Sequence, residues 1–441
     1  MKTVLMPTQL DDIQYMLSRE DVPNFSEPGT GKTLTTIGAI NSAKLASGLI
    51  VCPTIATTMW QETLEHELGA KAQHLKTRST AIDKTADFWV ASYGVIADHA
   101  EELKRHNLGA LVVDESHYIK SKDAQRTQVI MGEECDGSGG LYERSTQCWL
   151  LTGTPVERYS DDLWSQLRAT QPYVLEHYGA LTLEQFQRRF CRMEWKEYAN
   201  GKIKKYVSVG NQSMRLLNQM LYSDIGVIRR TMKDVEPYMP EVRFREIFTK
   251  AKVTAELKSL LVGKSEKEII EMLLAGGDKI VRARRLMGMA KVTEVRNYIA
   301  SIATDKQVLV GFWHEEVGKE LYKQLTAASF ATNLVYGATS QEARERIKAR
   351  FMNGEIDILV GQMQAMGVAW DGLQKTCSHV ILAEDDWSSA KIEQFYKRVA
   401  RKGQRHSVQV DFCNSLEAVD TAVKSIREDK RMQTKEILDA S

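Results

Sequence analysis

The chain has 441 residues, of which 43% are hydrophobic and 27% are charged, and its formal net charge is +1. These values exclude a disordered chain, and the length predicts two or three domains rather than one hydrophobic core. A net charge near zero gives no sign of a nucleic-acid partner, so any basic surface for one must be local.

The six cysteines form no CxxC pair, which argues against a zinc site and against a disulfide framework. The chain has no run of about 18 apolar residues, and its first residues lack the apolar core of a signal peptide. We therefore expect a cytoplasmic, or at least intracellular, protein without zinc and without a membrane-spanning segment.

Short β-branched runs alternate with amphipathic stretches in two separate blocks of the chain. Such alternation predicts an α/β fold, in which parallel sheets carry helices on both faces. In the first block, strands are expected at 49–52, 88–91, 111–114 and 149–152, and helices at 32–46 and 57–68.

The segment 26–33 reads Ser-Glu-Pro-Gly-Thr-Gly-Lys-Thr and leads into a predicted helix. Glycines let the backbone curl so that successive N–H groups face a polyphosphate at the N-terminus of a helix. Lys32 would neutralise the β- and γ-phosphates of ATP, and Thr33 would hold Mg²⁺ through its hydroxyl group. A flexible glycine turn is the alternative, but Gly-Lys-Thr at a helix start is uncommon by accident. The nucleotide-binding residues of this loop are then Gly29, Thr30, Gly31, Lys32 and Thr33.

Two carboxylates, Asp114 and Glu115, follow the apolar run 110–113. A buried strand that ends this way places both side chains at the carboxyl edge of a parallel sheet, where ligands bind. Asp114 would hold Mg²⁺, and Glu115 would orient and deprotonate the attacking water. An acidic pair after a strand is more often a solvated loop end, but the Gly-Lys-Thr loop earlier in the same block favours the catalytic interpretation.

Between the two blocks, residues 160–300 follow a mostly helical pattern, with an expected hairpin turn at 199–202 and an expected linker at 236–240. Helices are expected at 216–221, 255–261 and 267–303. In the second block, strands are expected at 308–312, 333–336, 358–360, 380–383 and 408–412, and helices at 315–326, 341–352 and 390–402.

Two arginines, Arg398 and Arg401, are three positions apart in the last of these predicted helices, so they would share one helical face. Guanidinium groups on such a face would reach the γ-phosphate and stabilise the charge of the transition state. The spacing alone more often marks a solvated face, but Gln394 before the pair and Gly403-Gln404 after it favour the catalytic interpretation.

The order of these motifs resembles helicase superfamily 2, and their details resemble the Swi/Snf family of DNA translocases over nearly the whole chain. The resemblance implies two RecA-like parallel-sheet lobes with helical insertions between them, ATP and Mg²⁺ as cofactors, and DNA held mainly at its phosphates. The segment 228–235, followed by Met239-Pro240, is similar to the linker that follows the first lobe in this family and that generic helicases lack. A basic helix end is the alternative interpretation of this segment.

Further residues take their expected roles from the same resemblance. Segment 5–9 is similar to the family's N-terminal glutamine motif, in which Gln9 would read adenine. Segments 50–54 and 89–93 are similar to motifs that contact DNA, which implies DNA-binding roles for Thr54 and Ser92. Segment 151–155 is similar to the motif that couples the nucleotide site to DNA; the expected coupling residues are His117, Thr152, Gly153, Thr154 and Gln394. Segment 361–374 resembles motif V, with Gly367 and Asp371 near the nucleotide, and 394–404 resembles motif VI.

The pattern also predicts domain boundaries. We expect a RecA-like, ATP-binding lobe at 1–165, its helical insertion at 166–225, a linker at 226–250, a second helical insertion at 251–300, and a second RecA-like lobe at 301–441.

Two local groups of basic residues are candidates for DNA contact. Lys202, Lys204 and Lys205 follow the expected hairpin turn, and Arg282, Arg284 and Arg285 lie in a helical stretch. For both groups a solvated charged surface is the favoured interpretation.

The expected function is an ATP-dependent double-stranded DNA translocase that remodels branched DNA by branch migration, fork regression or reannealing. Segments 287–298 and 310–314 are similar to the fork-remodelling branch of the family, although ordinary core residues account for them equally well. The alternatives are an ATP-driven remodeller that displaces proteins from DNA, and a non-catalytic ATP- or DNA-binding scaffold. The short chain leaves little room for targeting modules, which disfavours the remodeller and suits a bacterial or phage-encoded enzyme. A monomer is expected, although the sequence leaves the oligomeric state open.

Overall fold

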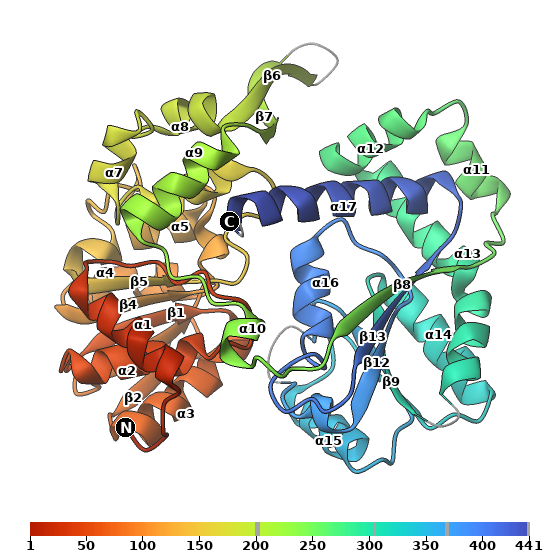
Figure 1. Cartoon of the computed structure of the whole chain (residues 1–441), viewed down its shortest axis with the longest axis horizontal. Helices are drawn as coiled ribbons and strands as arrows, with labels where there is room; N and C mark the ends of the chain where they lie inside the picture. Colours follow the sequence, from red (N-terminus) through yellow and green to blue (C-terminus); the bar gives the residue numbers. More distant parts are fainter. Residues whose placement is uncertain (199–202, 304–305, 367–369, 439–441) are drawn as a thin grey trace. The chain divides into compact units, whose positions relative to one another are not determined.

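The computed structural model describes residues 1–198, 203–303, 306–366 and 370–438 of the chain. These residues fall into two units (Figure 1). Unit 1 comprises Met1–Val235 together with the residues from Gln433 onward, and unit 2 comprises Glu236–Met432. Within the described ranges, no helix has both the length and the apolar sequence that crossing a membrane requires.

Unit 1 is built on a parallel sheet. Its strands are β1 (Gly48–Cys52), β2 (Ala72–Leu75), β3 (Phe88–Ser92), β4 (Leu108–Asp114) and β5 (Ser145–Leu151). They lie in the order β2-β3-β1-β4-β5, and β1 and β3 are buried along their whole length, as in parallel sheets covered on both faces. Beyond β5, isolated bridges join Asn24 to Leu151 and to Ile228, so two distant segments reach the same sheet edge.

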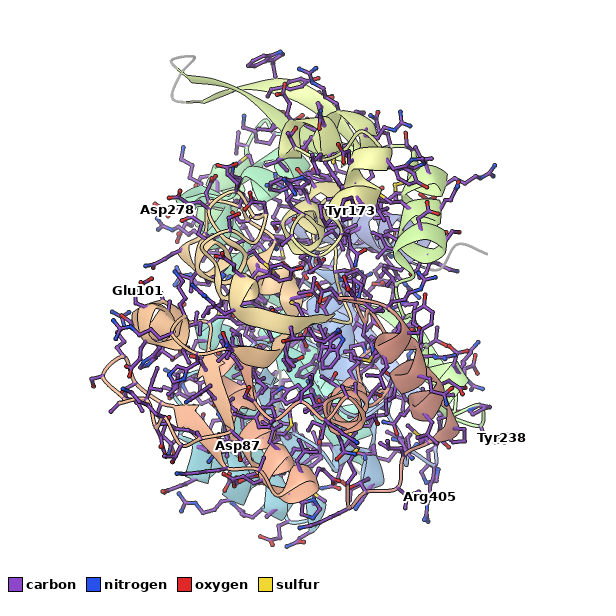
Figure 2. The ribbon with its side chains drawn as sticks, turned by 90° about the vertical axis from the view of Figure 1, so that its left-hand side faces the viewer. Asp87, Glu101, Tyr173, Tyr238, Asp278 and Arg405 are labelled. Carbon is purple, nitrogen blue, oxygen red and sulfur yellow. The ribbon has the colours of Figure 1, made fainter. Side chains whose placement is uncertain are left out.

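The helices of unit 1 surround this sheet and carry an antiparallel hairpin at one end (Figure 1). The first helices are α1 (Pro7–Ser18), α2 (Lys32–Ser42), α3 (Thr57–Leu68), α4 (Ile96–Leu103) and α5 (Gln125–Met131). After β5 come α6 (Trp164–Leu167), α7 (Pro172–His177), α8 (Leu183–Phe190), the hairpin strands β6 (Cys191–Tyr198) and β7 (Ile203–Asn211), α9 (Met214–Gln219) and α10 (Met232–Val235). Tyr173 of α7 is 84% exposed on the surface of unit 1 (Figure 2).

Unit 2 is built on a second parallel sheet, with the strand order β10-β11-β9-β12-β13-β8. Its strands are β8 (Val242–Phe248), β9 (Gln307–Phe312), β10 (Thr332–Val335), β11 (Ile358–Gln362), β12 (Cys377–Leu382) and β13 (Val408–Asn414). Its helices are α11 (Ala255–Leu261), α12 (Glu266–Ala275), α13 (Asp278–Ile302), α14 (Glu315–Ala327), α15 (Gln341–Met352), α16 (Ser389–Tyr396) and α17 (Ala418–Leu438), of which α17 continues past Met432.

The α/β fold with two parallel-sheet lobes is confirmed, and each strand predicted in the two blocks overlaps an observed strand. The segment 226–250, expected to be a linker, contains a strand in the structure: Val242–Phe248 forms the edge strand β8 of unit 2. Charged residues interrupt the apolar pattern of β8, as is common in edge strands. The helical stretch expected at 267–303 is broken between α12 and α13 by Gly276 and Gly277, whose φ angles are +74° and +114°.

The end of the chain also differs from the expectation that 301–441 forms one lobe, because the residues from Gln433 onward belong to unit 1. Ile437 and Leu438 are buried in the hydrophobic core of that unit. The side chain of Asn218 donates a hydrogen bond to the carbonyl oxygen of Ile437 at 3.0 Å, and the Tyr222 hydroxyl donates one to that of Leu438 at 2.6 Å. These contacts account for the place of the last turn of α17.

Candidate active site

The loop before α2 turns at two glycines. Gly29 and Gly31 have φ angles of +89° and +91°, a backbone region that side chains other than glycine rarely adopt. Gln9, which is 3% exposed, accepts a hydrogen bond from the Met6 N–H at 2.9 Å and donates one to the Gly31 carbonyl oxygen at 3.2 Å. A Cβ atom on Gly31 would lie 2.6 Å from the Gln9 amide nitrogen, so another residue here would also have to displace the Gln9 side chain.

Lys32 is the first residue of α2, directly after this turn. Its ammonium group donates hydrogen bonds to the carbonyl oxygens of Ser26 at 2.6 Å and Glu27 at 3.1 Å. Thr33, the next residue, lies in the first turn of α2 and is partly exposed. A glycine turn, a helix N-terminus and a cation held over the loop together form a site suited to phosphate groups.

Asp114 lies at the end of β4, opposite Leu151 of β5 in the parallel register. Its carboxylate accepts a hydrogen bond from the Trp60 indole N–H at 2.8 Å, and its carbonyl oxygen accepts one from the Tyr93 hydroxyl at 2.6 Å. Burial, followed by the neighbouring charge of Glu115, raises the pKa of Asp114 to about 6, while the Trp60 hydrogen bond and the Lys32 charge act in the opposite direction. Asp114 and Glu115 are both partly exposed, and a pair of accessible carboxylates is a donor set that suits a hard divalent cation such as Mg²⁺.

Glu115 is connected to the end of β5 through side chains. Its backbone is in the left-handed region, with φ +53°. The buried Thr152 hydroxyl donates a hydrogen bond to the Glu115 carboxylate at 3.3 Å and lies 3.0 Å from Nδ1 of His117. The Thr154 N–H donates to the same Thr152 oxygen at 3.0 Å. A proton on Nδ1 of His117 completes this arrangement, because the Thr152 oxygen then accepts two hydrogen bonds and donates one.

The coupling segment also touches the phosphate loop directly. A Cβ atom on Gly153 would lie 2.6 Å from Cδ of Pro28 and 3.2 Å from its backbone nitrogen. Gly153 is therefore in contact with the phosphate loop, which leaves no room for a side chain. A displacement of one loop therefore pushes on the other, since close-packed groups transmit displacement.

The segment that resembles the family's linker lies along the phosphate loop within unit 1. The Phe25 N–H donates to the carbonyl oxygen of Ile228, and the Glu27 N–H donates to that of Arg230, both at 2.8 Å. The Ile228 N–H returns a hydrogen bond to the Pro23 carbonyl oxygen at 3.0 Å. The linker segment therefore supports the phosphate loop as a strand-like neighbour, a contact that the sequence pattern does not predict.

Both arginines of this segment add side-chain contacts. Arg230 donates two hydrogen bonds to one carboxylate oxygen of Asp12 in α1, at 2.9 and 2.7 Å, and its backbone N–H donates to the Ser26 hydroxyl at 2.9 Å. Arg229 donates to the Phe25 carbonyl oxygen at 2.7 Å. The pKa of Asp12 is raised by burial, and the Arg230 hydrogen bond opposes this rise.

In unit 2, the segment around Arg398 and Arg401 differs from the prediction. The helix expected at 390–402 ends at Tyr396, and both arginines follow it in turns rather than on one helical face. The buried side chain of Gln404 donates hydrogen bonds to the carbonyl oxygens of Cys377 and Val399, at 2.9 and 3.2 Å, and these contacts hold the turns. Gly403 turns the chain again after these residues, at φ +89°.

The remaining residues expected in the site of unit 2 lie as follows. Arg401 forms an ion pair with Asp371, so two predicted site residues are in contact. Arg398 is partly exposed, and Gln394 lies partly exposed on α16. Gly367 lies outside the described residues.

The predicted DNA-contacting residues divide by exposure. Thr54 is exposed and lies two residues after β1, whereas Ser92 at the end of β3 is 5% exposed. Lys202 lies outside the described residues, as do the side chains of Lys204 and Lys205, whose backbone belongs to β7.

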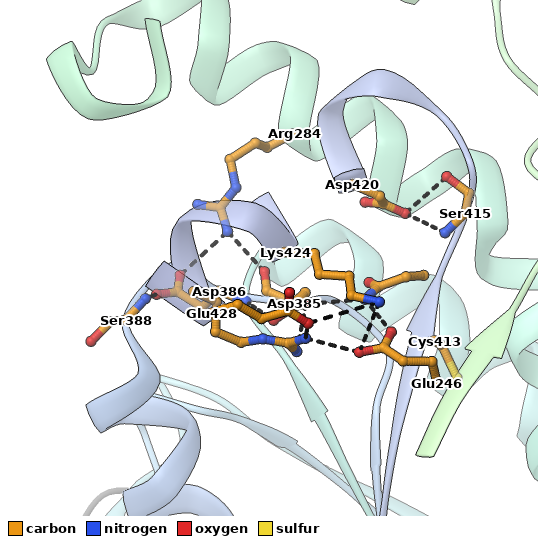
Figure 3. Close-up of polar contacts among 12 residues, drawn as sticks. Glu246, Arg284, Asp385, Asp386, Ser388, Cys413, Ser415, Asp420, Lys424 and Glu428 are labelled. Atoms are coloured by element: carbon orange, nitrogen blue, oxygen red, sulfur yellow. Dashed lines mark hydrogen bonds and ion pairs between the residues drawn. The ribbon is translucent and has the colours of Figure 1, made fainter. Parts of the chain in front are cut away.

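The prediction that Arg284 lies on a solvated surface is wrong, because this residue is only 7% exposed. Its guanidinium donates to the Asp385 carbonyl oxygen at 3.0 Å and to the Asp386 carboxylate at 3.3 Å (Figure 3). It also lies 4.2 Å from the Trp387 ring centroid. Its neighbours Arg282 and Arg285 form ion pairs at the surface.

Arg284 belongs to a buried charge network at the carboxyl edge of the unit 2 sheet (Figure 3). Lys291, 1% exposed, donates to the Cys413 carbonyl oxygen at 2.7 Å and to the Asp420 carboxylate at 2.9 Å. Burial raises the pKa of Asp385 to about 6, and the nearby charge of Arg427 opposes this rise. The network fastens α13 and α17 to the ends of β12 and β13.

Sequence reasoning missed the roles of several side chains in unit 1. Tyr93 belongs to a motif expected to contact DNA and Trp60 follows the other one, yet Trp60 holds the carboxylate of Asp114 and Tyr93 holds its carbonyl group. Asp12 belongs to none of the recognised motifs. These contacts join residues far apart in the sequence, so the local pattern contains no trace of them.

A glycine turn that opens a helix, a lysine over that turn and a carboxylate pair at the adjacent strand end define a nucleoside triphosphatase of the phosphate-loop class. Residues 9–286 match the SNF2-related domain, and residues 290–403 match the helicase conserved C-terminal domain. The chain belongs to the SNF2-related family. The expected membership in the Swi/Snf group of superfamily 2 is confirmed, and the protein is a DNA-dependent ATPase.

Curated relatives match almost the entire chain. The DNA annealing helicase and endonuclease ZRANB3 of Homo sapiens is 26% identical over 445 residues, which cover 96% of this chain and 39% of that protein. The SWI/SNF-related matrix-associated actin-dependent regulator of chromatin subfamily A-like protein 1 homolog of Caenorhabditis elegans is 22% identical, over 97% of this chain and 61% of that protein. The chain thus spans about two-fifths of the length of the ZRANB3 proteins.

A solved structure also matches the chain. It is the Sulfolobus solfataricus SWI2/SNF2 ATPase core in complex with dsDNA, with a TM-score of 0.46 and 18% identity, covering 100% of this chain and 98% of that one.

Proposed function

We propose that this protein is an ATP-dependent double-stranded DNA translocase that remodels branched DNA by branch migration, fork regression or reannealing. The observation that carries the proposal is the match of 96% of the chain to proteins named DNA annealing helicases. The hydrogen-bonded set of Glu115, Thr152 and His117 supports it, because it connects the expected catalytic base to the expected coupling motif.

In the proposed chemistry, unit 1 binds the nucleotide and supplies the base. The N–H groups of Gly29–Thr33 and the ammonium group of Lys32 hold the phosphates of ATP. Mg²⁺, when bound, neutralises negative charge on the β- and γ-phosphates, and Thr33 and Asp114 are the residues that would hold it. Glu115 orients a water molecule and accepts its proton as the water attacks the γ-phosphate. Gln9 recognises adenine in this proposal.

Unit 2 supplies positive charge to the same reaction in this proposal. Arg398 and Arg401 stabilise the charge that develops on the γ-phosphate, as arginines do in related motors. Arg401 then leaves its ion pair with Asp371 and contacts the nucleotide. Gly367 belongs to the same motif as Asp371, and Gln394 to the same motif as the two arginines. Closing and reopening of the two lobes during each ATP cycle would advance the protein along one DNA strand.

The coupling step uses the contacts around β5 in unit 1. A change at the Glu115 carboxylate alters its hydrogen bond with the Thr152 hydroxyl. A displacement of Pro28 moves Gly153, and with it the segment that follows. The protein is proposed to contact DNA mainly at its phosphates, so DNA binding should weaken as the salt concentration increases and should depend little on the base sequence. Thr54 and the lysines Lys202, Lys204 and Lys205 are proposed members of that contact surface.

A mobile four-way DNA junction with one labelled strand tests the proposal. The protein with ATP should convert the junction to two duplex products, and the Glu115→Gln variant or a non-hydrolysable ATP analogue should not. A protein that hydrolyses ATP on DNA but leaves the junction intact, while it displaces a bound protein block, would be a remodeller instead.

A further inference from the structure

The hairpin formed by β6 and β7 exposes two aromatic side chains next to each other. Trp195 is 68% exposed and Tyr206 is 46% exposed. The two residues are direct cross-strand partners, with ring centroids 5.2 Å apart and planes tilted by 37°. The hairpin projects from the helices of unit 1 (Figure 1). Two adjacent exposed aromatic side chains form a contiguous apolar patch, and such patches are candidate interaction sites.

The base of the hairpin is firmly attached to unit 1. The Ser208 hydroxyl donates to the Asp161 carboxylate at 2.6 Å, and both the N–H and the hydroxyl of Ser160 donate to the Asn211 side-chain oxygen, at 2.7 and 2.9 Å. A two-stranded hairpin alone is marginally stable in water, so these contacts at its base hold it in place. The aromatic pair therefore sits on a supported element.

The attachment leads back to the expected coupling motif. The Asp162 carboxylate, next to Asp161, accepts hydrogen bonds from the N–H groups of Glu157 and Arg158, at 2.8 and 2.7 Å. The Gln166 side chain donates to the Pro155 carbonyl oxygen at 2.9 Å and accepts from the Ser116 hydroxyl at 2.8 Å. Contiguous hydrogen bonds thus connect the hairpin base to the residues that follow Thr154 and Glu115.

The charge of the hairpin points to nucleic acid. The described hairpin residues 192–198 and 203–206 contain four basic and two acidic residues, an excess of two positive charges in a chain whose net charge is +1. Aromatic side chains that stack on bases, together with positive charge that follows the phosphates, are the elements of single-stranded nucleic-acid binding. Within an intact duplex the faces of the bases are already stacked on each other, so free faces occur where strands are unpaired.

We propose that the β6–β7 hairpin is a base-stacking element, in which Trp195 and Tyr206 engage unpaired DNA bases at a branch point. This inference rests on the proposed function and specifies how the enzyme distinguishes a branch from a plain duplex. The nucleotide site does not need the aromatic pair, so their removal leaves ATP hydrolysis on blunt duplex intact.

The test compares two DNAs of equal total length, a blunt duplex and a fork with two unpaired arms. The measured quantity is the DNA concentration that gives half-maximal stimulation of ATP hydrolysis. For the Trp195→Ala/Tyr206→Ala variant, this concentration should rise at least about fivefold for the fork and stay within about twofold for the duplex. The Trp195→Phe/Tyr206→Phe variant, which keeps an aromatic ring at each position, should behave like the unchanged protein.

The matched control is Tyr173→Ala, which removes a ring that is 84% exposed elsewhere on unit 1. It should change neither DNA response. Equal losses on fork and duplex in the double alanine variant, or no loss on either, would overturn the inference. Unchanged thermal unfolding of each variant shows that the hairpin residues act on DNA and not on folding.

A second measurement locates the contact directly. A fork with 5-iodouracil in one unpaired arm, irradiated with the whole protein, should cross-link to Trp195 or Tyr206, and the same base placed inside the duplex should not. Cross-linking only from the duplex position would overturn the inference. If the unchanged protein shows no preference for the fork over the duplex, the proposed function fails by itself; loss of the preference only in the alanine variant tests the hairpin.

Discussion

The hydroxyl of Thr152 donates a hydrogen bond to the carboxylate of Glu115, with 3.3 Å between the two oxygen atoms. The parallel register that places Asp114 opposite Leu151 makes this contact possible, because each of the two residues is the next one along its chain. Glu115, the expected catalytic base, and Thr152, an expected coupling residue, are therefore in direct contact at one edge of the sheet.

The first prediction concerns this contact. Thr152→Val keeps the shape of the side chain but leaves Glu115 without its hydroxyl donor and the Thr154 N–H without its acceptor. Buried groups that lose a partner cost about 1–3 kcal/mol, so DNA-stimulated ATP hydrolysis should fall about tenfold. Steady-state hydrolysis with and without DNA measures the loss, and binding of a fluorescent ATP analogue should change little. Thr152→Ser, which keeps the hydroxyl, is the control; equal losses in both variants would contradict the role of the hydrogen bond.

The second prediction concerns the base itself. Glu115→Gln preserves the size of the side chain and removes its ability to accept a proton. General-base catalysis contributes about 10²–10⁴-fold, so the turnover number should fall by that factor while ATP still binds. The Glu65→Gln change, on α3, provides a control at a carboxylate outside the site. Hydrolysis that survives the Glu115→Gln change would mean that another residue activates the water.

The third prediction concerns the contact of the coupling segment with the phosphate loop. Gly153→Ala places a methyl group 2.6 Å from Cδ of Pro28, so one of the two loops must move. Overpacking of this kind costs about 1–3 kcal/mol, and the displaced loop should raise the KM for ATP. Gly94→Ala is the matched control, because a Cβ atom there meets only the Ser92 hydroxyl, at 3.7 Å. A Gly153→Ala enzyme with unchanged KM and thermal stability would show that the contact is loose.

The fourth prediction concerns the ion pair of Asp12 and Arg230. Arg230→Ala leaves the Asp12 carboxylate, 6% exposed, without its guanidinium partner. Loss of a buried partner costs several kcal/mol, but Arg230 is 34% exposed, so solvent reduces the expected loss to about 1–3 kcal/mol. Arg188→Ala, which breaks an exposed ion pair on α8, should cost less than about 0.5 kcal/mol.

This prediction also has a pH dependence. Burial already raises the pKa of Asp12, and removal of Arg230 takes away the hydrogen bond and charge that oppose the rise. The folded variant should therefore bind a proton more tightly than the unfolded chain does, so its stability should recover as the pH falls. Thermal unfolding at pH 8 and pH 5 measures this, and the loss should be larger at pH 8. A loss that is the same at both values would mean that the ionised carboxylate is not the cause.

The strand ends of unit 1 could be predicted because buried parallel strands are continuous apolar runs, and the residues after them fall at one sheet edge. This is why Asp114 and Glu115 could be placed at a ligand-binding sheet edge from the sequence. The assignment of Lys32 rests on its glycine-containing loop, and that of Thr152 on the family resemblance. The same reasoning failed for β8, because Arg243, Arg245 and Glu246 interrupt its apolar pattern. Its partner strand, β13, lies far along the chain.

Other features depend on contacts between distant residues, which no local pattern contains. Arg284 has the sequence context of an exposed helix, yet its buried partners Asp385 and Asp386 lie about a hundred positions later. The linker segment carries a family motif, but the pairing of Ile228 with Phe25 emerges only from the folded sheet edge. The turns at Arg398 and Arg401 depend on Gln404, whose amide holds the carbonyl group of Cys377.

The central claim is that DNA controls ATP hydrolysis in this protein and that branched DNA does so best. The direct measurement is the rate of ATP hydrolysis against the concentration of single-stranded, blunt duplex, forked and four-way DNA, with Glu115→Gln as the inactive reference. The account predicts stimulation by DNA, with forked and four-way DNA effective at lower concentrations than blunt duplex. A rate that no DNA increases would contradict the account.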